Sequence, residues 1–157
     1  MRKTLILSPF FYPEPISTGK YNSSLAQAII ESGRKVIVGC SHPIYPDWAP
    51  SYTSESLAGA EIIRGGSYLK YPKSAVARRL VLEIWFSMHS IAVVLKVRKK
   101  IDSVIVVFPP SLFFYLIRFI LPCTVRRIGI VHDLQGLLGL TGDGMAKKIF
   151  SKILTHV

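Results

Sequence analysis

Short apolar runs alternate along this chain with longer segments in which apolar residues recur at helical spacing. The runs are continuous rather than alternating, which is typical of strands buried on both faces of a parallel sheet. The longer segments gather their apolar residues on one face, as amphipathic helices do. The predicted strands are Lys3–Leu7, Lys35–Cys40, Ala60–Arg64, Ser103–Phe108 and Val125–Val131, and the predicted helices are Lys20–Ser32, Ser74–Lys100, Ser111–Leu121 and Met145–His156.

Local signals mark where some of these elements begin and end. Ser17 or Thr18 is the expected N-cap of the first helix, and Gly33 is its expected C-terminal stop. The long second helix is expected to break near Arg78-Arg79. Neither repeats nor a linker interrupt the order of elements. The order predicts a single domain over residues 1–157 with an α/β fold: a Rossmann-like, doubly wound, mainly parallel sheet with helices on both faces.

Charge is the main feature that composition adds. Half of the 157 residues are apolar and 18% are charged, which excludes a disordered chain. The net charge is +11, and residues 62–101 contain nine cations against one acid, Glu83. Such a concentration indicates an anionic partner for one face. We call eight of these cations the basic block: Lys70, Lys73, Arg78, Arg79, Lys96, Arg98, Lys99 and Lys100.

The basic block flanks an apolar helix, as in helices that lie on a membrane surface. A merely solvated rim is almost as strong an interpretation, and nucleic acid is the weakest because no nucleic-acid-binding module is recognised. Inside the stretch Leu80–Val97, Glu83 and Lys96 are costly in a bilayer. The stretch Ser111–Leu121 is shorter than the ~20 residues that a span requires. We therefore expect no transmembrane helix and a cytoplasmic protein, peripheral at most to the inner face of the cytoplasmic membrane.

The two cysteines and the N-terminus agree with that compartment. Cys40 and Cys123 match neither a disulfide framework nor metal-ligand spacing, and both lie in apolar, strand-like surroundings. We expect both to be buried free thiols. The first apolar run is interrupted by Pro9 and by Pro13-Glu14-Pro15, so it is read as a strand rather than a signal peptide.

The loops that leave the strand ends are the candidate ligand sites, because ligands of open parallel sheets bind beyond the carboxyl ends of the strands. The first such loop leads into a helix N-terminus through Ser17, Thr18, Gly19 and Lys20. Backbone N–H groups there favour anions, and glycine admits a phosphate. The chain has neither the GxGxxG nor the P-loop glycine spacing, so a capped helix without a ligand is the stronger interpretation of these residues alone.

The second loop combines aromatic and polar side chains: His42, Tyr45, Asp47 and Trp48. Aromatic rings stack on the C–H faces of sugars, and the prolines of this loop lower its ordering cost. Simple packing of the rings is the alternative, and it is favoured on residues alone. Two further strand ends carry Pro110-Ser111, where turn chemistry is favoured, and His132-Asp133, where a hydrogen-bonding and a structural role are equally supported.

In this order, the residues resemble the N-terminal half of a bacterial family-4 glycosyltransferase of the two-domain GT-B type. The transferases of colanic-acid and related exopolysaccharide assembly are most similar. The resemblance covers almost the whole chain, although none of its six motifs is specific alone. The motifs are Tyr12-Pro13-Glu14, Ser17-Thr18-Gly19-Lys20-Tyr21, Tyr45-Pro46-Asp47-Trp48, Pro109-Pro110-Ser111-Leu112-Phe113, His132-Asp133 and Leu138-Gly139-Leu140.

The resemblance implies a retaining transfer of sugar from a nucleotide-sugar donor to a lipid-linked or saccharide acceptor in surface polysaccharide assembly, without metal or cofactor. It implies that the Ser17–Lys20 loop faces the donor diphosphate. It places His132 and Asp133 at the catalytic centre, with Asp133 the safer assignment. The residues implied to contact the acceptor are His42, Tyr45, Asp47, Trp48, Pro110 and Ser111.

Such enzymes carry an E-x7-E motif and a basic diphosphate clamp in a C-terminal donor domain, and this sequence contains neither. We therefore expect a truncated, acceptor-side domain that binds acceptor without transferring sugar. Two other readings stay open. One is a non-catalytic membrane- or partner-docking module. The other is a different Rossmann-like enzyme, such as a nucleotide-dependent oxidoreductase, against which the missing GxGxxG counts.

Overall fold

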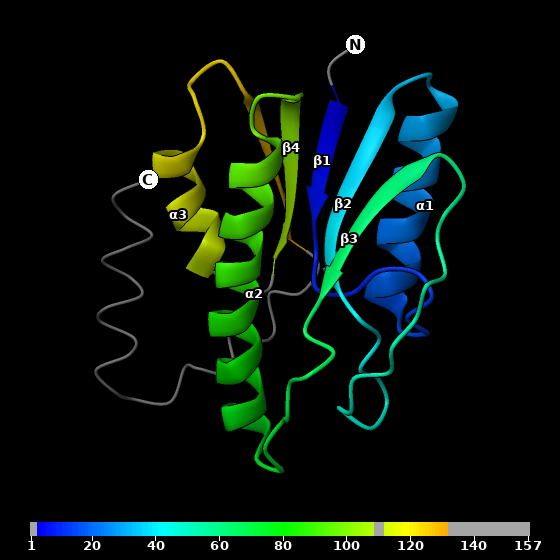
Figure 1. Ribbon diagram of the computed structural model, residues 1–157, viewed down its shortest axis with the longest axis vertical. Coiled ribbons are helices and arrows are strands. Elements are labelled where there is room, and N and C mark those ends of the chain that lie inside the picture. The colour runs from blue at the N-terminus through cyan, green and yellow to red at the C-terminus, as the bar shows by residue number, and fades with distance from the viewer. Residues whose placement is uncertain (1–2, 109–111, 132–157) are drawn as a thin grey trace.

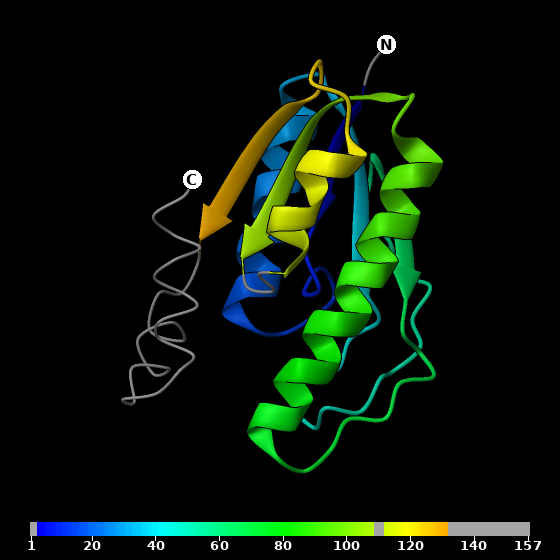
Figure 2. The same cartoon turned by 90° about the vertical axis from the view of Figure 1, so that its left-hand side faces the viewer.

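A computed structural model describes residues 3–108 and 112–131, which form a parallel sheet with helices on both faces (Figures 1 and 2). Its strands are β1 (Lys3–Leu7), β2 (Lys35–Ser41), β3 (Ala60–Gly65), β4 (Ile101–Phe108) and β5 (Arg126–Val131). Its helices are α1 (Ser17–Glu31), α2 (Ala75–Val97) and α3 (Leu112–Ile120). The strand order β3-β2-β1-β4-β5 places β1 at the centre, and every pairing is parallel. The predicted Rossmann-like α/β fold is confirmed.

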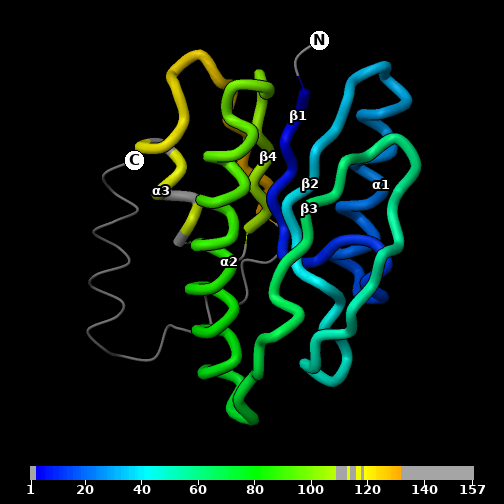
Figure 3. Tube along the Cα trace, in the orientation of Figure 1, coloured from blue at the N-terminus to red at the C-terminus, as the bar shows by residue number. Residues whose placement is uncertain are grey.

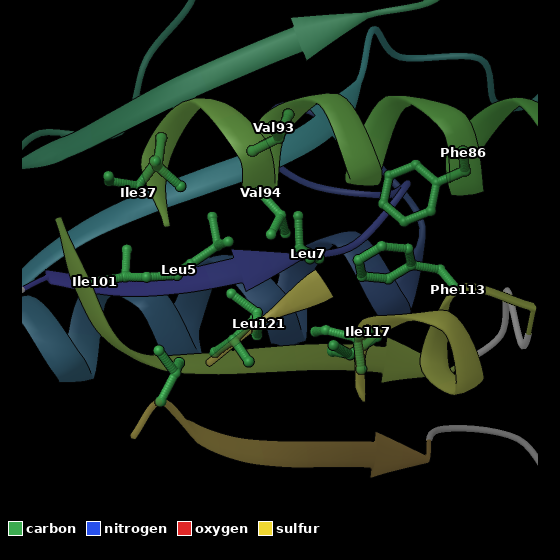
Figure 4. Close-up of a cluster of buried hydrophobic side chains, with 14 residues drawn as sticks. Leu5, Leu7, Ile37, Phe86, Val93, Val94, Ile101, Phe113, Ile117 and Leu121 are labelled. Carbon is green, nitrogen blue, oxygen red and sulfur yellow. The ribbon is translucent and has the colours of Figure 1, made fainter. Parts of the chain in front are cut away.

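The continuous apolar strands are explained by the two layers that cover the sheet. One face is covered by α1 and the other by α2 and α3 (Figure 2). Successive residues of β1 point to opposite faces, so Leu5 and Leu7 join the core beneath α2 while Ile6 joins the core beneath α1. Phe86 from α2 and Phe113 from α3 point toward one another near the carboxyl end of β1 (Figure 4).

The start of α1 differs from the prediction. The helix begins at Ser17 and its N-cap is Ile16, which supplies no side-chain cap, so the expected capping by Ser17 or Thr18 is wrong. The first turn instead packs directly on the preceding loop. A Cβ atom at Gly19 would lie 2.9 Å from the backbone oxygen of Glu14, so only glycine fits there without a shift.

The other ends follow the sequence more closely. Gly33 ends α1 as predicted, with a φ of 83° and its N–H donated to the carbonyl oxygen of Ile30 at 2.9 Å. By contrast, α2 continues through Arg78 and Arg79, so the predicted break is wrong. Arginine is a good helix former, and this helix contains neither glycine nor proline.

One of the two cysteines is buried and one is exposed. Cys40 lies in β2 with no exposed surface, and burial raises the pKa of its thiol to about 12. Cys123 is exposed, so its expected burial is wrong. The reason is local: β5 begins only at Arg126, which leaves Cys123 in the exposed turn after α3.

The carboxyl ends of the strands lie at one end of the molecule, where α2 begins beyond the sheet (Figures 1 and 3). The loops that leave β1, β2 and β3 start at this end (Figure 3). The predicted helix Met145–His156 lies outside the described residues.

Candidate ligand-binding site

A cavity of about 360 Å³ opens at the carboxyl ends of the strands, between α1, α2 and the loop after β2. Three stretches of chain that are distant in sequence contribute its walls, so it exists only in the folded domain. The lining residues are Phe10 and Ile16 after β1, Tyr45 and Trp48 after β2, and Ala75, Arg78, Arg79, Leu82 and Glu83 at the start of α2.

Glu14 fixes the wall that carries the aromatic residues. Its side chain is 3% exposed, and its carboxylate accepts the backbone N–H groups of Ile44 at 3.0 Å and of Tyr45 at 2.7 Å. These bonds hold the loop after β2 against the loop after β1. Burial raises the pKa of Glu14, and the backbone hydrogen bonds and the positive charge of Arg64 oppose that rise.

Arg64 links the same two loops from the outside. Its guanidinium donates to the carbonyl oxygen of Tyr12 at 2.6 Å and to that of Glu55 at 2.9 Å. A buried carboxylate and a part-buried guanidinium therefore brace the cavity wall together. Sequence reasoning did not single out Arg64, and it quoted Glu14 only within a motif.

Trp48 is held between two other side chains. The guanidinium carbon of Arg78 lies 4.9 Å from the centre of its ring, and Tyr71 meets it edge-on at 5.4 Å. Its φ of 55° lies in the left-handed region, which is strained for a tryptophan and is tolerated only when the surroundings impose it. Burial raises the pKa of Tyr71 to about 12, so its phenol is neutral at physiological pH.

Both helix N-termini at the cavity are open. The N-cap of α1 is Ile16, which lines the cavity, and α2 starts at Ala75, which also lines it. Neither helix has a side-chain cap or an acidic residue in its first turn. The unpaired backbone N–H groups and the positive ends of both helix dipoles therefore belong to this end of the molecule.

Not all residues predicted for the acceptor lie in the cavity. Tyr45 and Trp48 line it, but His42 and Asp47 do not. His42 is buried, its Nδ1 accepts the backbone N–H of Thr53 at 3.3 Å, and burial lowers its pKa, so it supports the loop as a neutral ring. Asp47 is exposed.

The loop predicted to face a donor diphosphate forms the first turn of α1. Ser17 and Lys20 are exposed, whereas Gly19 is buried against Glu14. Gly19 therefore permits close packing of the first turn of α1 against Glu14. None of the four residues from Ser17 to Lys20 lines the cavity.

The structure divides the basic block. Arg78 and Arg79 line the cavity, while the other six members are exposed, with four of them at the far end of α2. Along α2, five apolar side chains between 48% and 81% exposed form what we call the apolar stripe: Val76, Leu80, Ile84, Met88 and Leu95. By length and composition, α2 is the one described helix that could cross a membrane, although it also packs on the sheet as a core helix does.

A second cavity, of about 490 Å³, lies at the opposite end of the sheet. Its charged residues include Arg34, Asp102 and Arg126. Arg34 forms an ion pair with Asp102 and donates through Nε to Thr4 at 3.0 Å, so this arginine already has protein partners. We therefore regard the cavity near α2 as the better candidate site.

The predicted His132, Asp133, Pro110 and Ser111 lie outside the described residues. Within residues 3–108 and 112–131, no group of three histidine, cysteine or acidic side chains could hold a metal ion.

No protein-family model matches the chain, and neither the curated proteins nor the solved structures yield a match.

Proposed function

We propose that this chain is the acceptor-binding domain of a retaining, GT-B-type glycosyltransferase that builds surface polysaccharide. One observation supports the proposal most directly: the cavity at the strand ends joins Tyr45 and Trp48, from one of the resembling motifs, to charged side chains of α2. Aromatic rings next to hydrogen-bonding groups suit the C–H faces and hydroxyls of a sugar. The position agrees with the general rule for parallel sheets.

The division of labour in such an enzyme assigns donor binding to a second domain. Neither an E-x7-E motif nor the basic clamp for a departing diphosphate occurs in this sequence. We therefore propose that the 157-residue chain binds acceptor but does not transfer sugar by itself, and that the full reaction needs no metal. Turnover of a nucleotide sugar by this chain alone would contradict the proposal.

A saccharide titration tests the binding role. The chain has two tryptophans, so in a Trp85→Phe variant the fluorescence reports Trp48 alone. Uncharged mono- and disaccharides should change that emission with a saturable dependence. Tyr45→Ala should weaken binding at least tenfold, whereas Tyr68→Ala, which removes an exposed tyrosine outside the cavity, should not. Equal effects of the two substitutions would argue against the site.

A second candidate is a membrane-docking module, and the apolar stripe with cations at both ends of α2 favours it. Sedimentation with vesicles of anionic phosphatidylglycerol, compared with vesicles of neutral phosphatidylcholine, tests this candidate. Leu80→Gln with Met88→Gln should abolish binding, and Val131→Gln, at an exposed apolar position on β5, should not. Vesicle binding without any saccharide binding would favour the module over the transferase domain.

A further inference from the structure

The cavity near α2 is positively polarised from several directions. Arg78 and Arg79 contribute two cations, and the open N-terminus of α2, whose first residue Ala75 lines the cavity, contributes partial positive charge. Among the lining residues that the structure describes, Glu83 is the one acid. Two cations and one acid leave a formal charge of +1 on this described part of the lining before the start of α2 is counted. This polarity is more than an uncharged sugar requires.

Arg78 is oriented without being neutralised. The ring of Trp48 supports its guanidinium at 4.9 Å, and it forms no ion pair with a described residue. Its Nε is buried and has no hydrogen-bond partner among the described residues. A buried donor without a partner is energetically unfavourable, so a ligand oxygen that reaches it and accepts its hydrogen bond gains affinity. Stacking on an aromatic ring leaves the planar edge of a guanidinium available for bidentate bonds to an oxyanion.

The cavity has a cationic wall and an aromatic wall, and each suits a different part of one ligand. The arginines and the start of α2 suit a phosphate, since helix N-termini and guanidinium groups are both common phosphate partners. Tyr45 and Trp48 suit the apolar face of a sugar ring. A volume of about 360 Å³ lies within the usual range for small-molecule sites.

We propose that this cavity binds a phosphorylated saccharide, with Arg78 and Arg79 on the phosphate and the aromatic residues against the sugar. The inference rests on the proposed acceptor-binding function and narrows it to an anionic acceptor. A soluble sugar phosphate and a lipid-linked sugar phosphate share this chemistry. The basic block thereby has two separate parts: Arg78 and Arg79 serve the cavity, and the other members lie on the outer surface.

The test is isothermal titration calorimetry of the whole chain at low salt. The probes are the 1-phosphates of glucose, galactose, mannose and N-acetylglucosamine, each beside its methyl glycoside, together with inorganic phosphate. At least one sugar phosphate should bind ten times more tightly than both its methyl glycoside and inorganic phosphate. Arg78→Gln should remove most of that preference. Arg98→Gln is the matched control, because it deletes an exposed cation at the far end of α2.

Folding of each variant is checked by circular dichroism and thermal unfolding. Arg79→Gln is the second variant, since Arg79 is exposed and not needed for packing. Arg78→Lys, which keeps the charge but loses the planar fork, should give intermediate affinity. Equal weakening by Arg78→Gln and Arg98→Gln would overturn the proposal, because it would mean general electrostatic attraction.

The neutral probes separate this inference from the proposed function. Methyl glycosides that bind as tightly as their phosphates, and lose affinity with Tyr45→Ala, would overturn the anionic acceptor and leave the saccharide site intact. No binding of any sugar would overturn both. A farnesyl phosphodiester of the preferred sugar then identifies the source of the phosphate. Tighter binding of the farnesyl ester assigns a lipid-linked acceptor, and equal binding assigns a soluble one.

Discussion

Replacing Glu14 by glutamine tests how the candidate site is held. The carboxylate is buried and accepts two backbone N–H groups of the loop after β2, those of Ile44 and Tyr45. The amide of glutamine has nearly the same shape but only one accepting oxygen. Its NH2 group would face a backbone N–H, so one donor of the loop would lose its partner.

The magnitude follows from the two bonds and the cost of burying their acceptor. A hydrogen bond to a charged group contributes about 1.5–3 kcal/mol, and an unpaired buried N–H costs about 1–3 kcal/mol. The substitution also removes the desolvation of a buried charge, which offsets part of the loss. We expect Glu14→Gln to lower the free energy of unfolding by about 1–3 kcal/mol. The corresponding fall in Tm is about 2–4 °C per kcal/mol for a domain of this size.

Urea unfolding measures the loss, and amide hydrogen exchange at Ile44 and Tyr45 locates it. Glu31→Gln is the matched control, because Glu31 is exposed at the end of α1 and its described side-chain contact is a hydrogen bond to the half-buried Gln27. A Glu14→Gln variant within about 0.5 kcal/mol of wild type, with unchanged protection of both amides, would refute the reasoning.

The same pair of proteins gives a pH test with a definite sign. Burial raises the folded-state pKa of Glu14 above 4.5, so the native state holds this proton at higher pH than the unfolded chain does. Stability relative to Glu14→Gln should therefore rise as the pH falls from neutral toward 4.5. A difference that stays flat with pH would show that the carboxyl is not desolvated.

Three further predictions concern the frame around the site. A thiol reagent at about pH 8 should label the native protein at the exposed Cys123 and not at the buried Cys40. Cys123→Ser should therefore abolish labelling until the chain is unfolded. Rapid labelling of two thiols in the native protein would contradict the structure. Burial lowers the pKa of His89 below 6.5, so the stability gained by burying the neutral ring is fully present above that pH and is lost on acidification. In His89→Gln, the urea midpoint should therefore depend less on pH between about pH 7 and pH 5 than it does in wild type. An equally steep dependence in the variant would refute this. Gly39→Ala would place a Cβ atom 2.8 Å from Leu7 Cδ2 in the buried core, so it should lower the free energy of unfolding, measured with urea, by about 1–3 kcal/mol. An unchanged urea midpoint would contradict this.

Much of the fold could be predicted from the sequence because strand burial leaves a direct mark. A strand covered on both faces must be apolar at successive positions, as at Leu5, Ile6 and Leu7, and such runs are visible without any tertiary information. Helix ends were harder. The N-terminus of α1 depends on contact between Gly19 and Glu14, which is a packing relation rather than a capping signal.

The site was predictable only in part, because much of it also depends on packing between segments that are distant in sequence. Tyr45 and Trp48 are conspicuous by residue type and loop composition, and they do line the cavity. Arg78 and Arg79 were grouped with the outer cations because nothing in the sequence shows that α2 starts beyond the sheet. Glu14 was missed as the residue that holds the loop, because the N–H groups it binds lie about thirty residues further along the chain.

The central position of β1 also sets the order in which the sheet is completed during synthesis. Thr4 pairs with Val36 on one side and with Ser103 on the other, so the second partner emerges nearly one hundred residues after β1. Until then, β1 is an edge strand with open hydrogen-bonding groups, and α2 has only part of the surface on which it packs. The nascent chain therefore passes through a stage with an apolar, unpaired strand edge, the condition under which parallel sheets fold slowly and aggregate.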